Sequence, residues 1–397
     1  MTPAVGIDLG TTNSVLAAPV GRHVVVVPNA DGERVTPSAV AFTAAEGWLF
    51  GRAARRQAAL DPENTVTAVK RFVGVPFHDR KAVAGRVPYW VVPGAAHEPL
   101  VYLPASGAAH APEEIAAMIL YQLKADAERY PGEPVTRSVI AVPAHFSEDQ
   151  RRATEDAGRL AGPDAVATVA EPVAAAVAYG LDQAAGTVLV WDLGGATFDV
   201  SVLEARGGHL EVVALAGDPH LGGSDYDRRI AEYVAEQAQR AQGIDVRQDR
   251  RAMQRLLEAA ERARIGLSGA PETELTVPPV AADQRDPRHR SVTLTRAAFE
   301  ALTGDLTERR VLLFEQALGD AGIDAHRIAA AVLVGGATRT PAIQDLVRGL
   351  TGKEPRRAIG PDEVGAIGAA LLAAAHPAEP ERSVQTGAAP SSPWPWR

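Results

Sequence analysis

The 397-residue sequence contains no cysteine. This absence excludes a disulfide framework, a thiolate metal site and a cysteine nucleophile, and it is typical of a reducing compartment. No apolar run approaches the length of a membrane span, and the opening MTPAVGID lacks the charged and apolar regions of a signal peptide. We therefore expect a soluble, cytoplasmic protein that does not bind membranes.

Several common nucleotide-binding and hydrolase motifs are also missing. The sequence has no G-x-x-x-x-G-K-[ST], because TGKE at 351–354 lacks both the first glycine and the closing hydroxyl residue. No G-x-G-x-x-G leads from a strand into a helix, and neither H-E-x-x-H nor G-x-S-x-G occurs. The net charge of −9 argues against a nucleic-acid surface, so we expect no nucleic-acid partner.

The chain does contain alternating strand and helix patterns. Short, valine-rich apolar runs predict strands at 4–9, 23–28, 138–143, 187–193, 198–204, 210–217 and 330–336. Helices are predicted over 112–129, 147–161, 172–179, 224–242 and 249–268. The alternation indicates an α/β architecture with largely buried sheets, and the length indicates two or three domains.

Two strand–Asp–Leu–Gly turns stand in the two halves of the chain. Asp8 and Gly10 belong to GIDLGTTNS at 6–14, and Asp192 and Gly194 belong to VWDLGGATFDVSV at 190–202. One such turn is common and could be coincidence, but two copies predict two similar lobes. A turn of glycine and hydroxyl residues presents N–H and O–H donors to phosphate oxygens. Because a carboxylate repels phosphate, the two aspartates predict a Mg²⁺ ion between protein and nucleotide.

Ten stretches, in the order in which the family has them, resemble the nucleotide-binding (ATPase) domain of the 70-kilodalton heat-shock chaperones. Their motif sequences are most similar to those of the bacterial DnaK type. They are GIDLGTTNSV, RVTPSAVAF, TVTAVKRFVG, AVPAHFSEDQRRATEDAG, EPVAAAVAYGLD, DLGGATFDVSV, HLGGSDYDRR, AMQRLLEAAERARIGLS, VLVGGATRTPAIQ and GPDEVGAIGAAL. The resemblance implies an actin-like ATPase fold, with two similar ribonuclease-H-like lobes around a nucleotide cleft. Lobe I would span 1–183 with an inserted subdomain at about 39–107, and lobe II would span 184–375 with one at about 224–302.

The resemblance also implies the site residues. Those implied in catalysis are Lys70, Glu171, Thr197, Asp192 and Asp8, and the acids Asp8, Glu171 and Asp192 would hold Mg²⁺ mostly through water. Those implied at the phosphates of ATP or ADP are Gly10, Thr11, Thr12, Asn13, Gly194, Gly195 and Ala196. Those implied at the adenosine are Glu261, Arg264, Ser268, Gly335, Gly336, Ala337, Arg339 and Asp362. Helical spacing independently places residues 261, 264 and 268 on one face, which would otherwise be a solvated charged face.

The sequence departs from the family pattern at four places. Ala196 replaces a glycine of the second phosphate loop and would cost roughly 1 kcal/mol if the position requires positive φ. Ala337 replaces a hydroxyl or amide residue beside the adenine, and Ala170 with its preceding AVATV argues against docking of a J-domain co-chaperone. The residues after 375 do not resemble the family's leucine-rich linker, and we expect no peptide-binding domain. The Pro/Ser/Ala-rich stretch 376–397 is predicted to be disordered, with Trp394 and Trp396 either a docking motif or residues without a role.

Two functions remain open at this stage. The first is Mg-dependent ATP binding with slow ATP hydrolysis that drives a lobe-closure switch, in a chaperone-like protein without its own peptide-binding domain. The second is a nucleotide-gated protein-interaction module with little or no hydrolysis. Sugar kinases and filament-forming proteins are the alternatives within the same fold class. We expect a monomer whose partner is a nucleotide-exchange factor or another protein.

Overall fold

The computed structural model describes residues 4–85, 87–130, 132–242, 245–277 and 290–375. The predicted tail 376–397 lies outside these residues. The chain divides into two compact units. Among the described residues, unit 1 contains 4–142, 146–169 and 369–375, and unit 2 contains 143–145 and 170–368.

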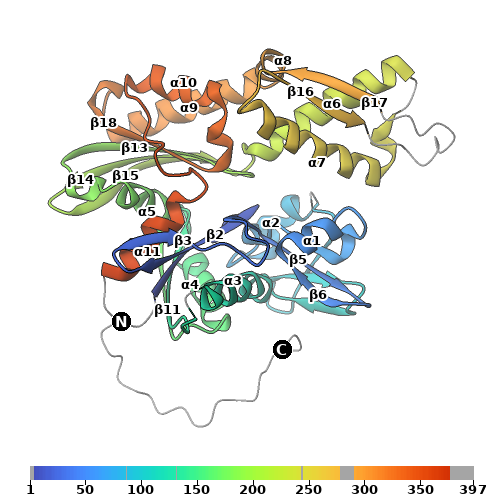
Figure 1. Cartoon of the computed structure of the whole chain (residues 1–397), viewed down its shortest axis with the longest axis horizontal. Coiled ribbons are helices and arrows are strands. Elements are labelled where there is room, and N and C mark those ends of the chain that lie inside the picture. The colour runs from blue at the N-terminus through green and yellow to red at the C-terminus, as the bar shows by residue number, and fades with distance from the viewer. Residues whose placement is uncertain (1–3, 86, 131, 243–244, 278–289, 376–397) are drawn as a thin grey trace, which may run out of the picture. The chain divides into compact units, whose positions relative to one another are not determined.

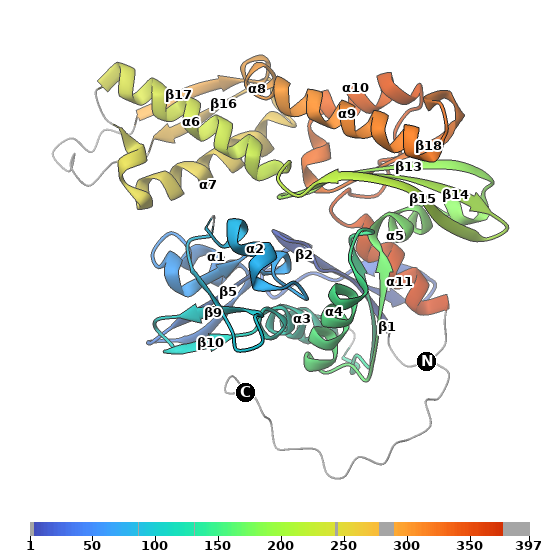
Figure 2. The ribbon, with the colours of Figure 1, turned by 180° about the vertical axis from the view of Figure 1, so that it is seen from behind.

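The main sheet of unit 1 carries the first of the two Asp–Leu–Gly turns. Its strand order is β12 (Ala165–Ala170), β11 (Arg137–Val142), β1 (Ala4–Asp8), β2 (Asn13–Val20) and β3 (His23–Val26), and β4 (Thr36–Pro37) pairs with β2. Strand β1 is parallel to β11 and antiparallel to β2. Helices α3 (Pro112–Arg129) and α4 (Glu148–Leu160) pack against each other beside this sheet (Figure 2). The core between them includes Ile7, Leu16, Met118 and Ile140.

The remaining elements of unit 1 lie mainly between β4 and α3 along the chain. One small sheet contains β5 (Ala39–Thr43), β6 (Gly47–Phe50) and β7 (Thr65–Thr67), and another contains β8 (Trp90–Pro93), β9 (Pro99–Leu103) and β10 (Ala108–His110). The helices here are α1 (Gly51–Gln57), α2 (Phe77–Ala84) and two 3₁₀ turns, η1 (Pro62–Asn64) and η2 (Val69–Arg71). The turn η2 carries Lys70.

The main sheet of unit 2 repeats the connectivity of the first. Its order is β15 (His209–Asp218), β14 (Phe198–Arg206), β13 (Gly186–Leu193) and β18 (Ile328–Val334). Strand β13 is antiparallel to β14 and parallel to β18, as β1 is to β2 and β11. Helices α5 (Glu171–Ala178), α9 (Gly304–Ala321) and α10 (Pro341–Thr351) accompany this sheet (Figure 1). The shared pattern confirms the predicted α/β architecture of two similar halves.

The rest of unit 2 packs helices against a two-stranded sheet. Its elements are α6 (Gly223–Gln242), η4 (Val246–Gln248), α7 (Arg250–Leu267), β16 (Glu272–Val277), β17 (Arg290–Thr295) and α8 (Arg296–Leu302). Shorter connections are η3 (Leu181–Gln183), η6 (Ala325–Arg327) and η7 (Gly336–Arg339). Helix α11 (Val364–Ala375) ends the described chain, and it belongs to unit 2 as far as Gly368 and to unit 1 from Ala369. No helix in the described ranges is both long and apolar enough to span a bilayer.

Local sequence signals explain where several helices begin. Ser147 accepts a hydrogen bond from the Gln150 N–H, and the Gln150 side chain accepts one from the Ser147 N–H, which forms a capping box before α4. Asp249 accepts hydrogen bonds from the N–H groups of the first turn of α7. Pro112 occupies the first position of α3, where no donor is needed. The observed bounds of α3, α4, α5, α6 and α7 confirm the five predicted helices to within one or two residues.

Candidate functional site

The first Asp–Leu–Gly turn joins β1 to β2 in unit 1. A Cβ on Gly10 would lie 2.0 Å from the carbonyl oxygen of Asn13, so only glycine fits there. Ser38 Oγ donates to the Gly10 carbonyl oxygen at 2.7 Å, and the Ser38 N–H donates to the Thr12 carbonyl oxygen at 2.9 Å. The Ser14 hydroxyl lies 2.8 Å from Ser38 Oγ, and both serines are buried. Ser38 therefore fixes the main chain of the turn by hydrogen bonds, and Ser14 contacts Ser38. The sequence alone did not indicate either serine.

The side chains implied at this turn differ in exposure. Asp8 ends β1 and is half-buried, as are Thr11 and Thr12, whereas Asn13 is exposed. The hydroxyl and backbone donors of the turn therefore reach the surface of unit 1, while the hydrogen bonds to Ser38 fix its backbone. This arrangement suits the binding of an anion by N–H and O–H groups.

Lys70 belongs to the same unit and is buried. Its side chain is only 8% exposed, and Nζ lies 5.7 Å from the centroid of the Phe146 ring. The neighbours Val69 and Phe72 are buried in the core of unit 1 and anchor the turn that carries it. Because lysine is rarely buried unless its charge is paired, Lys70 is not an ordinary surface lysine.

The backbone before Lys70 is strained. Ala68 has φ 55° and ψ 29°, the left-handed conformation that side chains with a Cβ disfavour. Its carbonyl oxygen accepts the N–H of Arg71 at 3.1 Å, so the left-handed residue begins the turn η2. Unfavourable backbone conformations of this kind persist where the surrounding packing demands them, often at functional sites.

We predict that Ala68→Gly raises the free energy of unfolding by up to about 1 kcal/mol, because glycine adopts positive φ without a Cβ penalty. Thermal or urea denaturation measures the change. The matched control is Ala297→Gly in the exposed first turn of α8, which should destabilise because glycine is the poorer helix former. Equal destabilisation by both substitutions would contradict the strain at Ala68.

The second Asp–Leu–Gly turn joins β13 to β14 in unit 2 and is attached to the segment 222–224. The Gly194 N–H donates to the Thr197 carbonyl oxygen at 3.1 Å and closes the turn. The N–H groups of Gly223 and Ser224 donate to the carbonyl oxygens of Gly194 and Gly195 at 2.9 and 2.7 Å. Segment 222–224 therefore fixes the carbonyl groups of the turn.

Ala196 occupies an ordinary backbone conformation in this turn. The described non-glycine residues with positive φ are Ala68 and His97, so the conditional strain considered for Ala196 does not arise. Its side chain is 6% exposed, and a Cβ on Gly222 would lie 2.4–2.5 Å from the Ala196 backbone atoms. The two segments approach each other closely because position 222 is glycine. The residue that must lack a side chain is therefore Gly222, and position 196 can be alanine.

Four residues implied at the adenosine lie together in unit 2, and one of them, Gly335, meets the second turn. Gly335 has φ 81°, and a Cβ there would lie 2.3 Å from the carbonyl oxygen of Leu193. A Cβ on Gly336 would lie 2.2 Å from Oδ1 of Asp362, so this carboxylate occupies the space that glycine leaves. Arg339 donates from Nε and Nη2 to Asp362 Oδ2 at 3.0 and 2.7 Å. The two glycines thus place Asp362 and Arg339 beside the turn.

Arg264 has a partner that the sequence alone did not indicate. Its Nε and Nη2 donate to the Asp227 carboxylate at 2.6 and 3.2 Å, and both side chains are buried. Burial alone would lower the pKa of Arg264, but the Asp227 carboxylate outweighs it and raises that pKa. A Cβ on Gly223 would lie 3.2 Å from Arg264 Nη2, so this ion pair supports the segment that holds the second turn.

Other predicted residues at the adenosine are less closely joined. On α7, Glu261 is half-buried, and Ser268 Oγ lies 3.5 Å from the Arg264 carbonyl oxygen, the limit of a hydrogen bond. Ala337 is buried in η7 and packs into the core of unit 2. Ala337 therefore contributes to packing, whatever its distance from a bound base.

Two of the carboxylates expected near Mg²⁺, Glu171 and Asp192, belong to unit 2. In the strand register, Asp192 on β13 is opposite Val334 on β18, the residue before Gly335. On the other side of β13 it is opposite Asp199 on β14. Glu171 is the first residue of α5. Within the residues that the structure describes, no three His, Asp or Glu side chains are grouped to bind a metal. Mg²⁺ keeps several waters and needs only one or two carboxylates, so the water-mediated contacts expected of Asp8, Glu171 and Asp192 do not require such a group.

Asp199 is a further acid that sequence reasoning missed. It faces Asp192 in the β13–β14 register, and its Oδ1 lies 3.3 Å from Nδ1 of His145. A Cβ on Gly217 would lie 2.4 Å from Asp199 Oδ1, so the neighbouring strand is kept free of a side chain there. The sequence signal was the second acid in the repeated motif, DLGGATFD.

Comparison with known proteins matches the motifs over nearly the whole chain. The family model described as Hsp70 protein matches residues 4–385. A chaperone protein DnaK of Thermus thermophilus is 52% identical over 376 residues, which are 94% of this chain and 61% of that protein. The chaperone protein dnaK3 of Thermosynechococcus vestitus is 50% identical over 94% of this chain and 55% of its own length.

The chaperone protein dnaK of Cyanidioschyzon merolae is 48% identical over 94% of this chain and 62% of its own length. The chain therefore spans somewhat more than half the length of these relatives. The repeated sheets, the two glycine-dependent turns and the matched residues agree with one another, and the chain belongs to the Hsp70 protein family.

Proposed function

We propose that the chain binds ATP and ADP with Mg²⁺ and hydrolyses ATP slowly. The observation that carries the proposal is the repeated turn. Each copy follows a strand, has a glycine close by whose Cβ would collide with the main chain, and has carbonyl groups fixed by hydrogen bonds from another segment. Backbone N–H groups fixed in this way bind phosphate oxygens without reorganisation. The DnaK chaperones named above are the relatives that support this proposal.

The residue roles follow from the chemistry of phosphoryl transfer. Lys70 would stabilise the negative charge that develops on the γ-phosphate, and Thr197 would orient the attacking water. Magnesium, when bound, would neutralise phosphate charge, and Asp8, Glu171 and Asp192 would hold its waters. Gly10, Thr11, Thr12 and Asn13 would contact the phosphates from unit 1, and Gly194, Gly195 and Ala196 from unit 2. Glu261, Arg264, Ser268, Gly335, Gly336, Ala337, Arg339 and Asp362 would surround the adenosine.

Slow hydrolysis would act as a timer for a conformational switch, here the closure of the two lobes. A nucleotide-exchange factor is the class of protein partner that such a switch requires. The predicted lobe boundaries, the monomeric state and the cytoplasmic location stay predictions. Affinity capture on the purified chain in ATP and in ADP would identify a partner that distinguishes the two states.

The proposal is tested by nucleotide binding and turnover of the purified chain. Calorimetry should give tight binding of ATP and ADP in the presence of Mg²⁺ and weaker binding after its removal with a chelator. Phosphate release from ATP should be slow and should stop without Mg²⁺. Tight binding with no phosphate release would instead support the interaction module without hydrolysis, and no binding would overturn both functions.

A further inference from the structure

Arg310 on α9 is buried, and its charge is poorly satisfied by hydrogen bonds. The side chain is 0% exposed, and within the described ranges none of its three guanidinium nitrogens makes a hydrogen bond of good geometry, although the nearby Tyr226 hydroxyl favours the charged form. Its neighbour Arg309 is half exposed and pairs with Asp218. A buried charge without hydrogen bonds lowers the stability of a fold, so its presence requires a reason.

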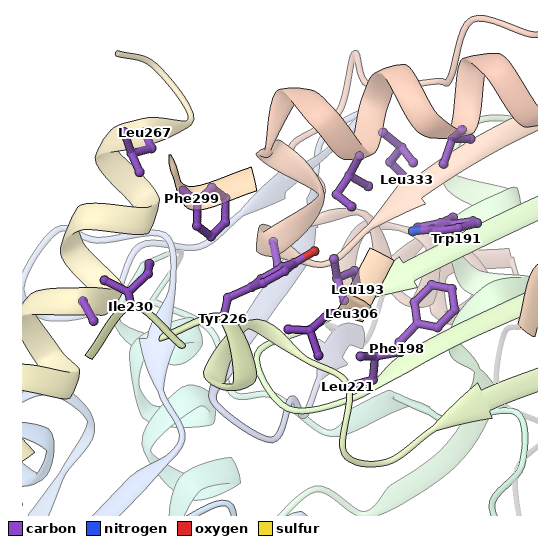
Figure 3. Packing of buried hydrophobic residues seen from close by; sticks show 14 of the residues in the cluster. Trp191, Leu193, Phe198, Leu221, Tyr226, Ile230, Leu267, Phe299, Leu306 and Leu333 are labelled. Carbon is purple, nitrogen blue, oxygen red and sulfur yellow. The ribbon is translucent and has the colours of Figure 1, made fainter. Parts of the chain in front are cut away.

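The guanidinium lies between two aromatic rings that border the second turn. The carbon Cζ of Arg310 lies 4.6 Å from the ring centroid of Tyr226 and 6.0 Å from that of Phe198. Phe198 directly follows Thr197, and Tyr226 follows the segment 222–224 that holds the turn. Figure 3 shows both rings in one buried cluster, with Phe198 next to Trp191. Arg310 therefore lies close to two residues that neighbour the turn and its attached segment in the sequence.

The charge persists in this surrounding. Burial lowers the pKa of Arg310, although Tyr226 and Asp225 act in the opposite direction. Arginine starts from so high a pKa that it stays protonated in proteins. The Asp225 carboxylate also accepts the Gly222 N–H at 2.9 Å, and Arg228 lies 3.9 Å from it, so Asp225 is shared among several groups. The contacts with aromatic rings offset only part of the desolvation cost.

We propose that Arg310 is a positioning residue whose buried positive charge strengthens the binding of nucleotide phosphates at the turn 194–197. In a water-poor interior a charge acts over a longer distance than at the surface and is little screened by salt. The charge acts through the turn and does not touch the nucleotide. This inference rests on the proposed function, because it assumes that the turn binds phosphate.

The test compares ligands that differ in charge. In Arg310→Met, which retains the length and loses the charge, calorimetry should show ATP affinity lowered about tenfold, as expected for one buried charge. Affinity for uncharged adenosine should stay within about twofold of the wild type, because the electrostatic effect requires phosphate. The melting temperature should rise, because an apolar side chain replaces a desolvated charge. Arg310→Lys, which keeps the charge, should retain most of the ATP affinity.

Several outcomes would overturn the inference. They are unchanged ATP affinity in Arg310→Met, equal loss of ATP and adenosine affinity, and failure of this variant to fold, which would make the guanidinium a structural requirement. Arg309→Met on the same helix is the matched control and should leave ATP affinity unchanged. If the wild-type chain binds adenosine but not ATP, the proposed function fails, whatever the variants show.

Discussion

Replacement of Lys70 with alanine is expected to lower the rate of ATP hydrolysis by about 10²–10³-fold, because the mechanism we propose places this buried cation at the developing charge, where it would contribute on the order of 3–4 kcal/mol to the transition state. Lys70 is 8% exposed, and the turn that carries it has neighbours in the core. Water therefore cannot easily replace it. Single-turnover phosphate release under saturating ATP measures the effect on the chemical step.

The control for Lys70→Ala is Lys124→Ala on α3 of the same unit. Lys124 pairs with Glu128 one helical turn away, at 2.6 Å, and no role in hydrolysis is proposed for it. Loss of that pair should cost a few tenths of a kcal/mol of stability and leave hydrolysis near the wild-type rate. Equal rates in the wild type and Lys70→Ala would remove Lys70 from the proposed mechanism, and ATP affinity measured separately would show whether binding survives.

Gly368→Ala is expected to lower the free energy of unfolding by about 3 kcal/mol or more, in the range of severe overpacking. A Cβ on Gly368 would lie 1.7 Å from the carbonyl oxygen of Ala174 and 2.9 Å from its Cα. Both are main-chain atoms, so no rotamer change relieves the collision, and α11 would have to move away from α5. Urea denaturation of the purified variant measures the loss.

A glycine in an open environment gives the matched control. Gly349 lies in α10, is exposed, and would place a Cβ with no atom within 4 Å. Alanine is the better helix former by about 1 kcal/mol, so Gly349→Ala should stabilise the chain by up to that amount. The same chemical change should thus have opposite signs in the two helices. Stabilisation by both would show that α11 and α5 are not closely packed.

The sequence predicted those features whose signals are local. The apolar runs ending at Asp8 and Asp192 are strands because their residues suit a buried sheet, and the capping residues Ser147 and Asp249 mark the starts of α4 and α7. The repeated turn predicted the duplication because both copies carry the same residues after a strand. These inferences needed only neighbours within a few positions.

The supports of the site could not be predicted in this way. Ser38 reaches Gly10 across 28 positions, and Asp227 reaches Arg264 across 37. Neither pair has a spacing signal, because the contact is formed by the tertiary fold. The conditional expectation of backbone strain at Ala196 did not hold for the same reason, because the sequence alone does not show which segment packs against this residue. The space around position 196 is determined by Gly222, which lies on another segment.

The contact between Gly222 and Ala196 also limits how the chain can vary. A side chain at position 222 would collide with the N, Cα and carbonyl carbon of residue 196, which every amino acid possesses. A second substitution at position 196 therefore cannot suppress the effect of one at position 222. Position 222 is fixed as glycine for as long as the N–H groups of 223 and 224 remain bonded to the turn.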